Sequence, residues 1–132
     1  MFTCPAKPEK QNDPKTSQDF SKGDPFRLGV VRIDDVALAW VSAEVVYNVN
    51  AHLKAVTPLS NTIMVTQANG RSGYLPDDAS YDTPNFETKA STVARGCAEN
   101  GLVNGFVELI RKTSPKDGPG VSAAAAQSVA AR

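Results

Sequence analysis

The sequence is poor in the residues that most often hold metals. Its 132 residues include one histidine, His52, and two cysteines, Cys4 and Cys97, with no Cys-x-x-Cys pair. A structural zinc site usually takes four Cys or His ligands, so the chain has too few for a self-contained site of this kind. We expect two free thiols. The alternative is a disulfide between Cys4 and Cys97, because the sequence does not show how far apart the two residues lie in space.

Long apolar runs and net charge are also absent. No stretch approaches the roughly 20 apolar residues of a membrane span, and the first twenty residues, MFTCPAKPEKQNDPKTSQDF, hold no apolar run suited to a signal peptide. Lys and Arg (14) balance Asp and Glu (14), which gives no electrostatic reason to propose a nucleic acid or an acidic membrane as partner. We expect a soluble chain without a transmembrane segment.

The distribution of apolar residues predicts one small folded region between two polar or small-residue segments. Residues 1–26 are rich in proline, lysine and other polar residues, so we expect a loop-like or disordered segment there. Residues 113–132 carry an alanine run with few bulky apolar side chains and are expected to form a disordered tail. The foldable part is then 27–112.

The first half of this part predicts a hairpin followed by a helix. Two short β-rich runs, Leu28–Ile33 and Val36–Val41, flank Asp34-Asp35, as in a tight hairpin, and Trp40 is expected in the core. The apolar spacing after Glu44 predicts a helix that Pro58 ends. Glu44 therefore lies where the strand meets the helix, a position that often faces a cleft.

The second half predicts a strand, a long loop and a second helix. Asn61–Ala68 reads as the strand, and Asn69-Gly70 marks its end because both residues tolerate positive φ. The loop continues to about Phe86, and loops of that length are often functional. An interrupted apolar stripe predicts a helix over Thr92–Lys112, whose spaced glycines would weaken it or let it pack closely on a neighbour.

Two segments carry a resemblance to a known family. They are NTIMVTQANGRSGYLPDDASYDTPNFE, in which a strand ends in Asn-Gly and is followed by Gly-Tyr, a Pro, a Tyr and an aromatic-Glu pair, and the upstream VVRIDDVALAWVSAEVV. Together they resemble the C-terminal portion of the catalytic domain of neutral or alkaline (non-lysosomal) ceramidases. Ser42-Ala43 stands where that family has Pro-Gly before a Glu, and the family's zinc-binding histidines have no counterpart in this chain.

The resemblance implies a zinc centre and a reaction class. It places zinc ligands at Glu44 and Tyr81, to be completed by histidines from the missing N-terminal half of the domain, and a lipid amide such as ceramide as substrate. Family members are often secreted or periplasmic. The residues alone favour other roles. Glu44 would be an acidic residue in the first turn of the following helix, where a negative charge is favourable, and the ring of Tyr81 would anchor its loop on the core. Asn69, Arg71 and Tyr74 are candidates to border a substrate cleft. The alternative role for Asn69 is to shape the turn.

We therefore expect an α+β fold with a small, mainly antiparallel sheet and two helices on one face, forming part of a larger ceramidase-like domain. The first functional hypothesis is a partial zinc-dependent amide hydrolase that is inactive alone. The alternative is a non-catalytic structural or partner-binding module. In either case, the isolated chain is expected to expose apolar surface that a missing part would cover.

Overall fold

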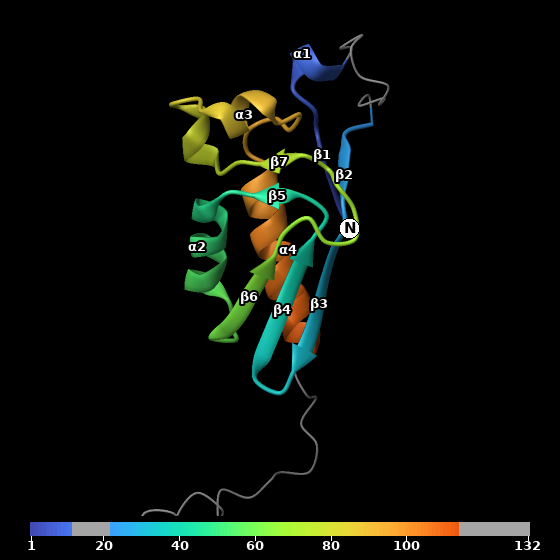
Figure 1. The fold of residues 1–132 in the computed structure, drawn as a ribbon, viewed down its shortest axis with the longest axis vertical. Coiled ribbons are helices and arrows are strands. Elements are labelled where there is room, and N and C mark those ends of the chain that lie inside the picture. The colour runs from blue at the N-terminus through green and yellow to red at the C-terminus, as the bar shows by residue number, and fades with distance from the viewer. Residues whose placement is uncertain (12–21, 114–132) are drawn as a thin grey trace, which may run out of the picture.

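The computed structural model describes residues 1–11 and 22–113 and has the expected α+β architecture, with a three-stranded sheet at its centre (Figure 1). The predictions for residues 12–21 and 114–132, a loop and a disordered tail, lie outside the described residues. The elements in chain order are β1 (Phe2–Cys4), α1 (Pro8–Gln11), β2 (Asp24–Phe26), β3 (Leu28–Ile33), β4 (Val36–Val41), β5 (Glu44–Val45), α2 (Tyr47–Val56), β6 (Asn61–Val65), β7 (Tyr74–Leu75), the 3-10 helix η1 (Asp78–Tyr81), α3 (Phe86–Ala90) and α4 (Ala98–Thr113).

The central sheet combines a hairpin with a parallel strand. β3 and β4 pair antiparallel in the predicted register around Asp34, whose φ of 52° accommodates the tight turn. α2 then carries the chain to β6, which pairs parallel with β4. Because β4 and β6 run in the same direction, their carboxyl ends meet at one end of the sheet, where Val41 and Val65 are the last strand residues.

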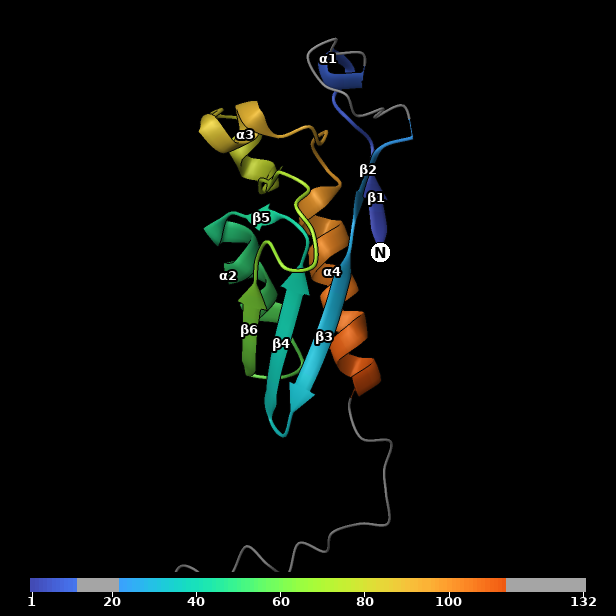
Figure 2. The same ribbon diagram turned by 45° about the vertical axis from the view of Figure 1, so that its right-hand side comes forward.

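Both longer helices cover the same face of the sheet, as expected. α4 runs along the far side of the strands in Figures 1 and 2, and it packs on β3 and α2. Small residues on β4, Ala37 and Ala39, are fully buried beneath the helices. Gly101 and Gly105 of α4 face the side chains of Phe2 and Leu28 so closely that a Cβ at either position would clash. The spaced glycines therefore serve close packing.

The other face of the sheet is open. Trp40, which was predicted to lie in the core, lies on this face instead. The alternation of β4 buries Ala39 and Val41 on the helix side, so Trp40 points to the opposite face and is only half-buried. On that face Val31 is 51% exposed, Ile33 59%, Ile63 51% and Val65 38%. We call these alternate positions of β3, β4 and β6 the open sheet face. No described element covers it.

The N-terminal segment is more ordered than its composition suggests. β1 pairs antiparallel with β2, and the rings of Phe2 and Phe26 lie 5.2 Å apart between centroids. Cys4 and Cys97 form a disulfide with a Cα–Cα distance of 5.7 Å, so the expectation of two free thiols is wrong. The pairing of β1 with β2 is what brings the start of the chain to the beginning of α4, a proximity that sequence separation conceals.

The segment after β6 also contains structure that the sequence pattern did not reveal. The expected loop includes β7, which pairs parallel with β5, and the 3-10 helix η1. α3 begins at a capping box in which Asn85 and Thr88 exchange hydrogen bonds. The second long helix begins at Ala98 rather than at Thr92, because Gly96 adopts a φ of 93°. Within the described ranges, no helix is long and apolar enough to cross a membrane.

Candidate functional site

A polar hollow of about 200 Å³ lies beyond the carboxyl ends of β4 and β6. In sheets with parallel strands, ligands commonly bind at this end. Its lining comes from β5, from the segment after β6 and from the start of β7. The side chains that contribute polar atoms are Glu44, Gln67, Arg71, Ser72 and Tyr74. The structure thus brings together three of the residues predicted from sequence: Glu44, Arg71 and Tyr74.

Glu44 presents its carboxylate to this hollow. The residue is exposed, and its Oε2 accepts a hydrogen bond of 2.8 Å from the side-chain amide of Gln67. Its backbone is fixed, because the Glu44 amide donates to the carbonyl of Gly73 at 2.8 Å. Gln67 was not predicted from sequence. Its position just beyond a strand end and its φ of 54° are the features that aim it at Glu44.

The loop that supplies Arg71 and Tyr74 is anchored to the end of β4. The Ser72 amide donates to the carbonyl of Ser42 at 2.7 Å, and the Ser42 hydroxyl accepts from the Arg27 amide at 3.0 Å. Buried Ser42, which replaces the proline of the resembled motif, therefore ties the loop to Arg27, the residue between β2 and β3. Tyr74 pairs in register with Glu44, and its ring meets Phe86 edge-on, with centroids 5.7 Å apart.

Asn69 shapes the turn rather than bordering the hollow around Glu44. It has a φ of 57°, and Gly70, with a φ of 148°, lies against the side chain of Ser42. The Asn69 carbonyl accepts a hydrogen bond of 3.4 Å from the Arg27 guanidinium. Asn69 is not part of the hollow around Glu44. Its neighbour Gly70 borders a second hollow of about 240 Å³ that Arg71 shares.

Tyr81 lies at a different hollow from Glu44. Its hydroxyl donates to the carbonyl of Val93 at 2.7 Å, and burial raises the pKa of its phenol. The ring borders a largely apolar hollow of about 410 Å³ together with Lys7 and Thr88. Lys7 lies 5.5 Å from the centre of the Tyr81 ring, and its ammonium donates to the carbonyl of Thr88. In this arrangement Tyr81 anchors its loop.

His52 belongs to a network that joins three elements. Its Nδ1 lies 2.7 Å from Oε1 of Glu99, so it connects α2 to α4. The other oxygen of Glu99 accepts from the amide of Asp78 at 3.0 Å, at the start of η1. The Asp78 carboxylate accepts from the amide of Gly96 at 2.9 Å. This network positions the Tyr81 segment against the helices. His52, the only histidine in the sequence, therefore has a structural role.

The described residues do not by themselves fit the zinc centre that the resemblance implies. Glu44 offers an accessible oxygen donor, but the Tyr81 hydroxyl is committed to Val93 at a separate hollow. His52 is paired with Glu99. No group of three or more His, Cys, Asp or Glu residues in the described part of the chain is placed to hold a metal ion.

Comparison with known proteins found no matching family model, no matching curated protein and no matching solved structure.

Proposed function

We propose that this chain is part of a zinc-dependent amide hydrolase of the neutral ceramidase type, and that it is inactive until a histidine-bearing polypeptide completes the site. The observation that carries the proposal is the exposed Glu44 carboxylate, held in a polar hollow at the carboxyl ends of β4 and β6. Arg71 and Tyr74, the candidates to border a substrate cleft, border the same hollow. A lipid amide such as ceramide is the proposed substrate class.

In this proposal the chain's own groups position and bind rather than react. Gln67 donates a hydrogen bond to one oxygen of Glu44, whose side chain lines the hollow. Arg71 supplies a positive charge, and Tyr74 supplies a hydroxyl and a ring against which an acyl or amide group can pack. When bound, zinc would supply Lewis acidity for hydrolysis of the amide.

The test compares the chain alone with the chain joined to the polypeptide encoded directly upstream of it. We expect zinc content and hydrolysis of a fluorogenic N-acyl sphingosine only in the joined protein. Glu44→Ala should lower both by at least about a hundredfold, since even residues that only support a metal ligand cost roughly 10- to 100-fold. Glu108→Ala is the matched control, because Glu108 is an exposed glutamate on α4 that pairs with Lys112. A joined protein that binds no zinc would end the proposal.

Tyr81→Phe separates the two roles open to that residue. If Tyr81 leaves Val93 to ligate zinc in the joined protein, the variant loses zinc. If it keeps its present hydrogen bond, the variant loses only the stabilisation from that bond, which is typically about 1 kcal/mol.

The second candidate function, a non-catalytic partner-binding module, is favoured by the open sheet face. It predicts that Glu44→Ala changes neither metal content nor turnover in any assembly of the chain.

A further inference from the structure

A second hollow, of about 240 Å³, adjoins the hollow around Glu44. Arg71 and Ser72 line both hollows, and Arg27, from the junction of β2 and β3, lines only the second. The described residues that line it include no aspartate or glutamate. We call this second space the arginine hollow. Because the whole chain has no net formal charge, the positive character of the hollow is created by the fold, which brings together two arginines far apart in the sequence.

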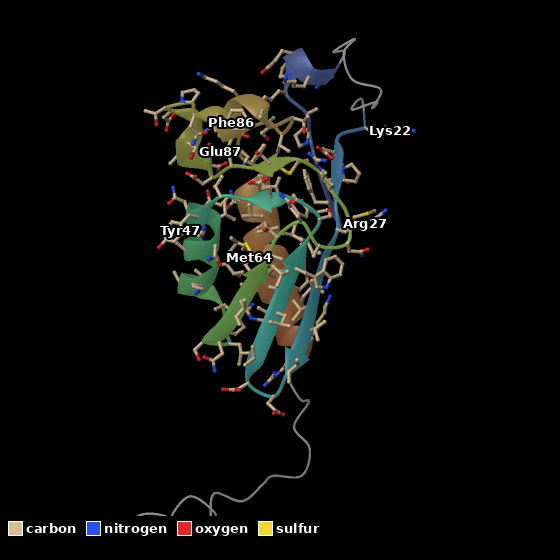
Figure 3. All side chains as sticks on the ribbon, in the orientation of Figure 1. Lys22, Arg27, Tyr47, Met64, Phe86 and Glu87 are labelled. Carbon is tan, nitrogen blue, oxygen red and sulfur yellow. A yellow bond between two sulfur atoms is a disulfide. The ribbon has the colours of Figure 1, made fainter. Side chains whose placement is uncertain are left out.

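Arg27 is exposed and is held at the border of the arginine hollow. Its backbone amide donates to the Ser42 hydroxyl at 3.0 Å, and its guanidinium donates to the carbonyl of Asn69 at 3.4 Å. Figure 3 shows the Arg27 side chain beside the loop that follows β6. A guanidinium carries five N–H donors, so a single bond to a neutral carbonyl leaves its charge and most of its donors available to a ligand.

The two arginines of the hollow are not neutralised, in contrast to Arg95. The guanidinium of Arg95 forms hydrogen bonds of 2.6 and 2.9 Å with the carboxylate of Asp82. In the described part of the chain, neither Arg27 nor Arg71 forms an ion pair, and the Arg71 guanidinium donates no hydrogen bond. Like charges at one hollow repel each other, so an anion placed between the two guanidiniums is stabilised by both.

The floor of the arginine hollow adds hydroxyl donors. Ser42 is 2% exposed, and its hydroxyl oxygen lies 3.3 Å from that of Ser72. Whichever hydroxyl donates to the other, one proton remains, and its only described acceptor is the Pro25 carbonyl, 3.5 Å from the Ser72 oxygen. A Cβ on Gly70 would lie 3.0 Å from the Ser42 Cβ, so glycine at this position lets the loop lie close to the floor.

These donors match a phosphate group better than a carboxylate. A phosphate monoester carries about −1.5 to −2 charges at pH 7 and has three terminal oxygens, which two guanidiniums and a hydroxyl can share. A carboxylate has one charge and two oxygens, and a single bidentate arginine already satisfies it. The location is also favourable, because ligands commonly bind beyond the carboxyl ends of parallel strands, and Ser42 directly follows β4.

The rest of such a ligand has a polar space beside it. Through Arg71 and Ser72, the arginine hollow borders the hollow around Glu44. The Glu44 carboxylate accepts hydrogen bonds there, and the side-chain carbonyl of Gln67 is a second acceptor, because only the amide nitrogen of Gln67 is used in its bond to Glu44. Donors on one side and acceptors on the other favour a ligand that carries hydroxyl groups next to its phosphate.

We propose that the arginine hollow binds the phosphate of a small phosphate monoester, whose hydroxyl-bearing part lies in the hollow around Glu44. Arg27 and Arg71 hold the phosphate from two sides, and Glu44 and Gln67 accept from the hydroxyls. The inference concerns binding by the chain itself and depends neither on zinc nor on a second polypeptide.

Titration of the chain with glycerol 3-phosphate in metal-free buffer, followed by NMR of the backbone amides, tests the site. We expect the amides of Gly70, Arg71 and Ser72 to shift and to saturate with a Kd of roughly 1 mM or below. The Gln67 amide should shift with glycerol 3-phosphate and much less with inorganic phosphate, which lacks the hydroxyl-bearing part. Acetate, as the carboxylate probe, should bind at least about tenfold more weakly, because it offers one charge in place of two.

Matched substitutions locate the binding. Arg27→Gln and Arg71→Gln should each weaken glycerol 3-phosphate binding by at least about tenfold, because each removes charge-assisted hydrogen bonds. Arg111→Gln is the control and should stay within about twofold. Arg111 is an exposed arginine in the last turn of α4, at the opposite end of the sheet (Figure 1). The dispersion of the amide spectrum shows whether each variant remains folded.

Four outcomes would overturn the inference. The first is the absence of a saturable shift, and the second is an equal loss of affinity in all three variants, which would show a response to overall charge. If acetate binds as tightly as glycerol 3-phosphate, the assignment to phosphate is wrong. If inorganic phosphate shifts Gln67 as strongly as the ester does, the placement of the hydroxyl-bearing part is wrong. Because the chain is titrated alone and without zinc, none of these outcomes bears on the hydrolase proposal.

Discussion

At the scale of single residues, Asp24 is a buried carboxylate, and burial of its charge lowers the stability of the fold. Its side chain is only 7% exposed, although its carboxylate accepts a hydrogen bond of 2.7 Å from the Thr92 hydroxyl. Burial raises the pKa of Asp24, and the hydrogen bond from Thr92 only partly opposes this. The folded state therefore binds the proton more tightly than the unfolded chain, and the ionised form lowers stability above the raised pKa.

Asp24→Asn should consequently stabilise the protein at neutral pH, because the amide keeps an acceptor for Thr92 and removes the buried charge. The advantage should shrink as pH falls through the raised pKa of Asp24, and it should vanish below the ordinary aspartate value of about 3.9. Urea unfolding between pH 3 and 8 measures this. Asp34→Asn, at the exposed hairpin turn, is the control. A variant less stable than the parent at pH 7 would contradict the argument.

Gly29 is required by the Trp40 indole rather than by its backbone conformation. Since a Cβ would come within 2.2 Å of the ring, Gly29→Ala should displace the indole and destabilise the protein by about 1–3 kcal/mol. In a Trp40→Ala background the clash is gone, and alanine, which suits a strand better than glycine, should be neutral or stabilising there. A double-mutant cycle by urea unfolding checks this. Equal costs in both backgrounds would show that the indole is not the cause.

At the scale of elements, the sequence pattern correctly predicted the elements that short-range interactions determine. The alternation of β3 and β4 around Asp34, and the apolar spacing of α2 up to Pro58, placed these elements correctly. The orientation of β4 could not be read in the same way. Hydrophobicity placed Trp40 inside, whereas the close approach of the helices requires the small side chains of Ala37 and Ala39 there. That requirement exists only in the assembled fold.

Elements held by distant contacts escaped the sequence pattern. β1 and β2 have only three residues each and lie in a segment rich in proline and polar residues, and they are fixed by each other and by the Phe2–Phe26 contact. Only part of the candidate site could be predicted from the sequence. Glu44, Arg71 and Tyr74 meet because β5 and β7 pair, which the sequence did not predict. The resemblance had instead placed Glu44 together with Tyr81. Gln67 was missed because a strand-end glutamine has no distinctive pattern, and the commitment of the Tyr81 hydroxyl to Val93 depends on tertiary packing.

At the scale of the whole molecule, the Cys4–Cys97 disulfide links the N-terminal strand to the segment just before the last helix. It ties β1 to the start of α4 across a sequence separation of 93 residues, and the fully buried Cys4 packs within the core. Closing so long a loop restricts the unfolded chain strongly, in the entropic account of disulfide stabilisation. Because disulfides persist in oxidising compartments and are reduced in the cytosol, the stability of this fold should depend on where it is made.

Replacing both cysteines with alanine should lower the free energy of unfolding by about 2–5 kcal/mol. Dithiothreitol should lower the urea midpoint of the parent protein toward that of the double variant and leave the double variant unchanged, which makes the variant its own control for effects of the reductant. The loss should fall first on β1 and the N-terminal turns of α4, because Phe2 and Gly101 pack where the disulfide joins them. Hydrogen exchange resolves this. A midpoint indifferent to dithiothreitol would mean that the packing of Phe2 on Phe26 and Gly101 holds the N-terminal strand without the covalent link.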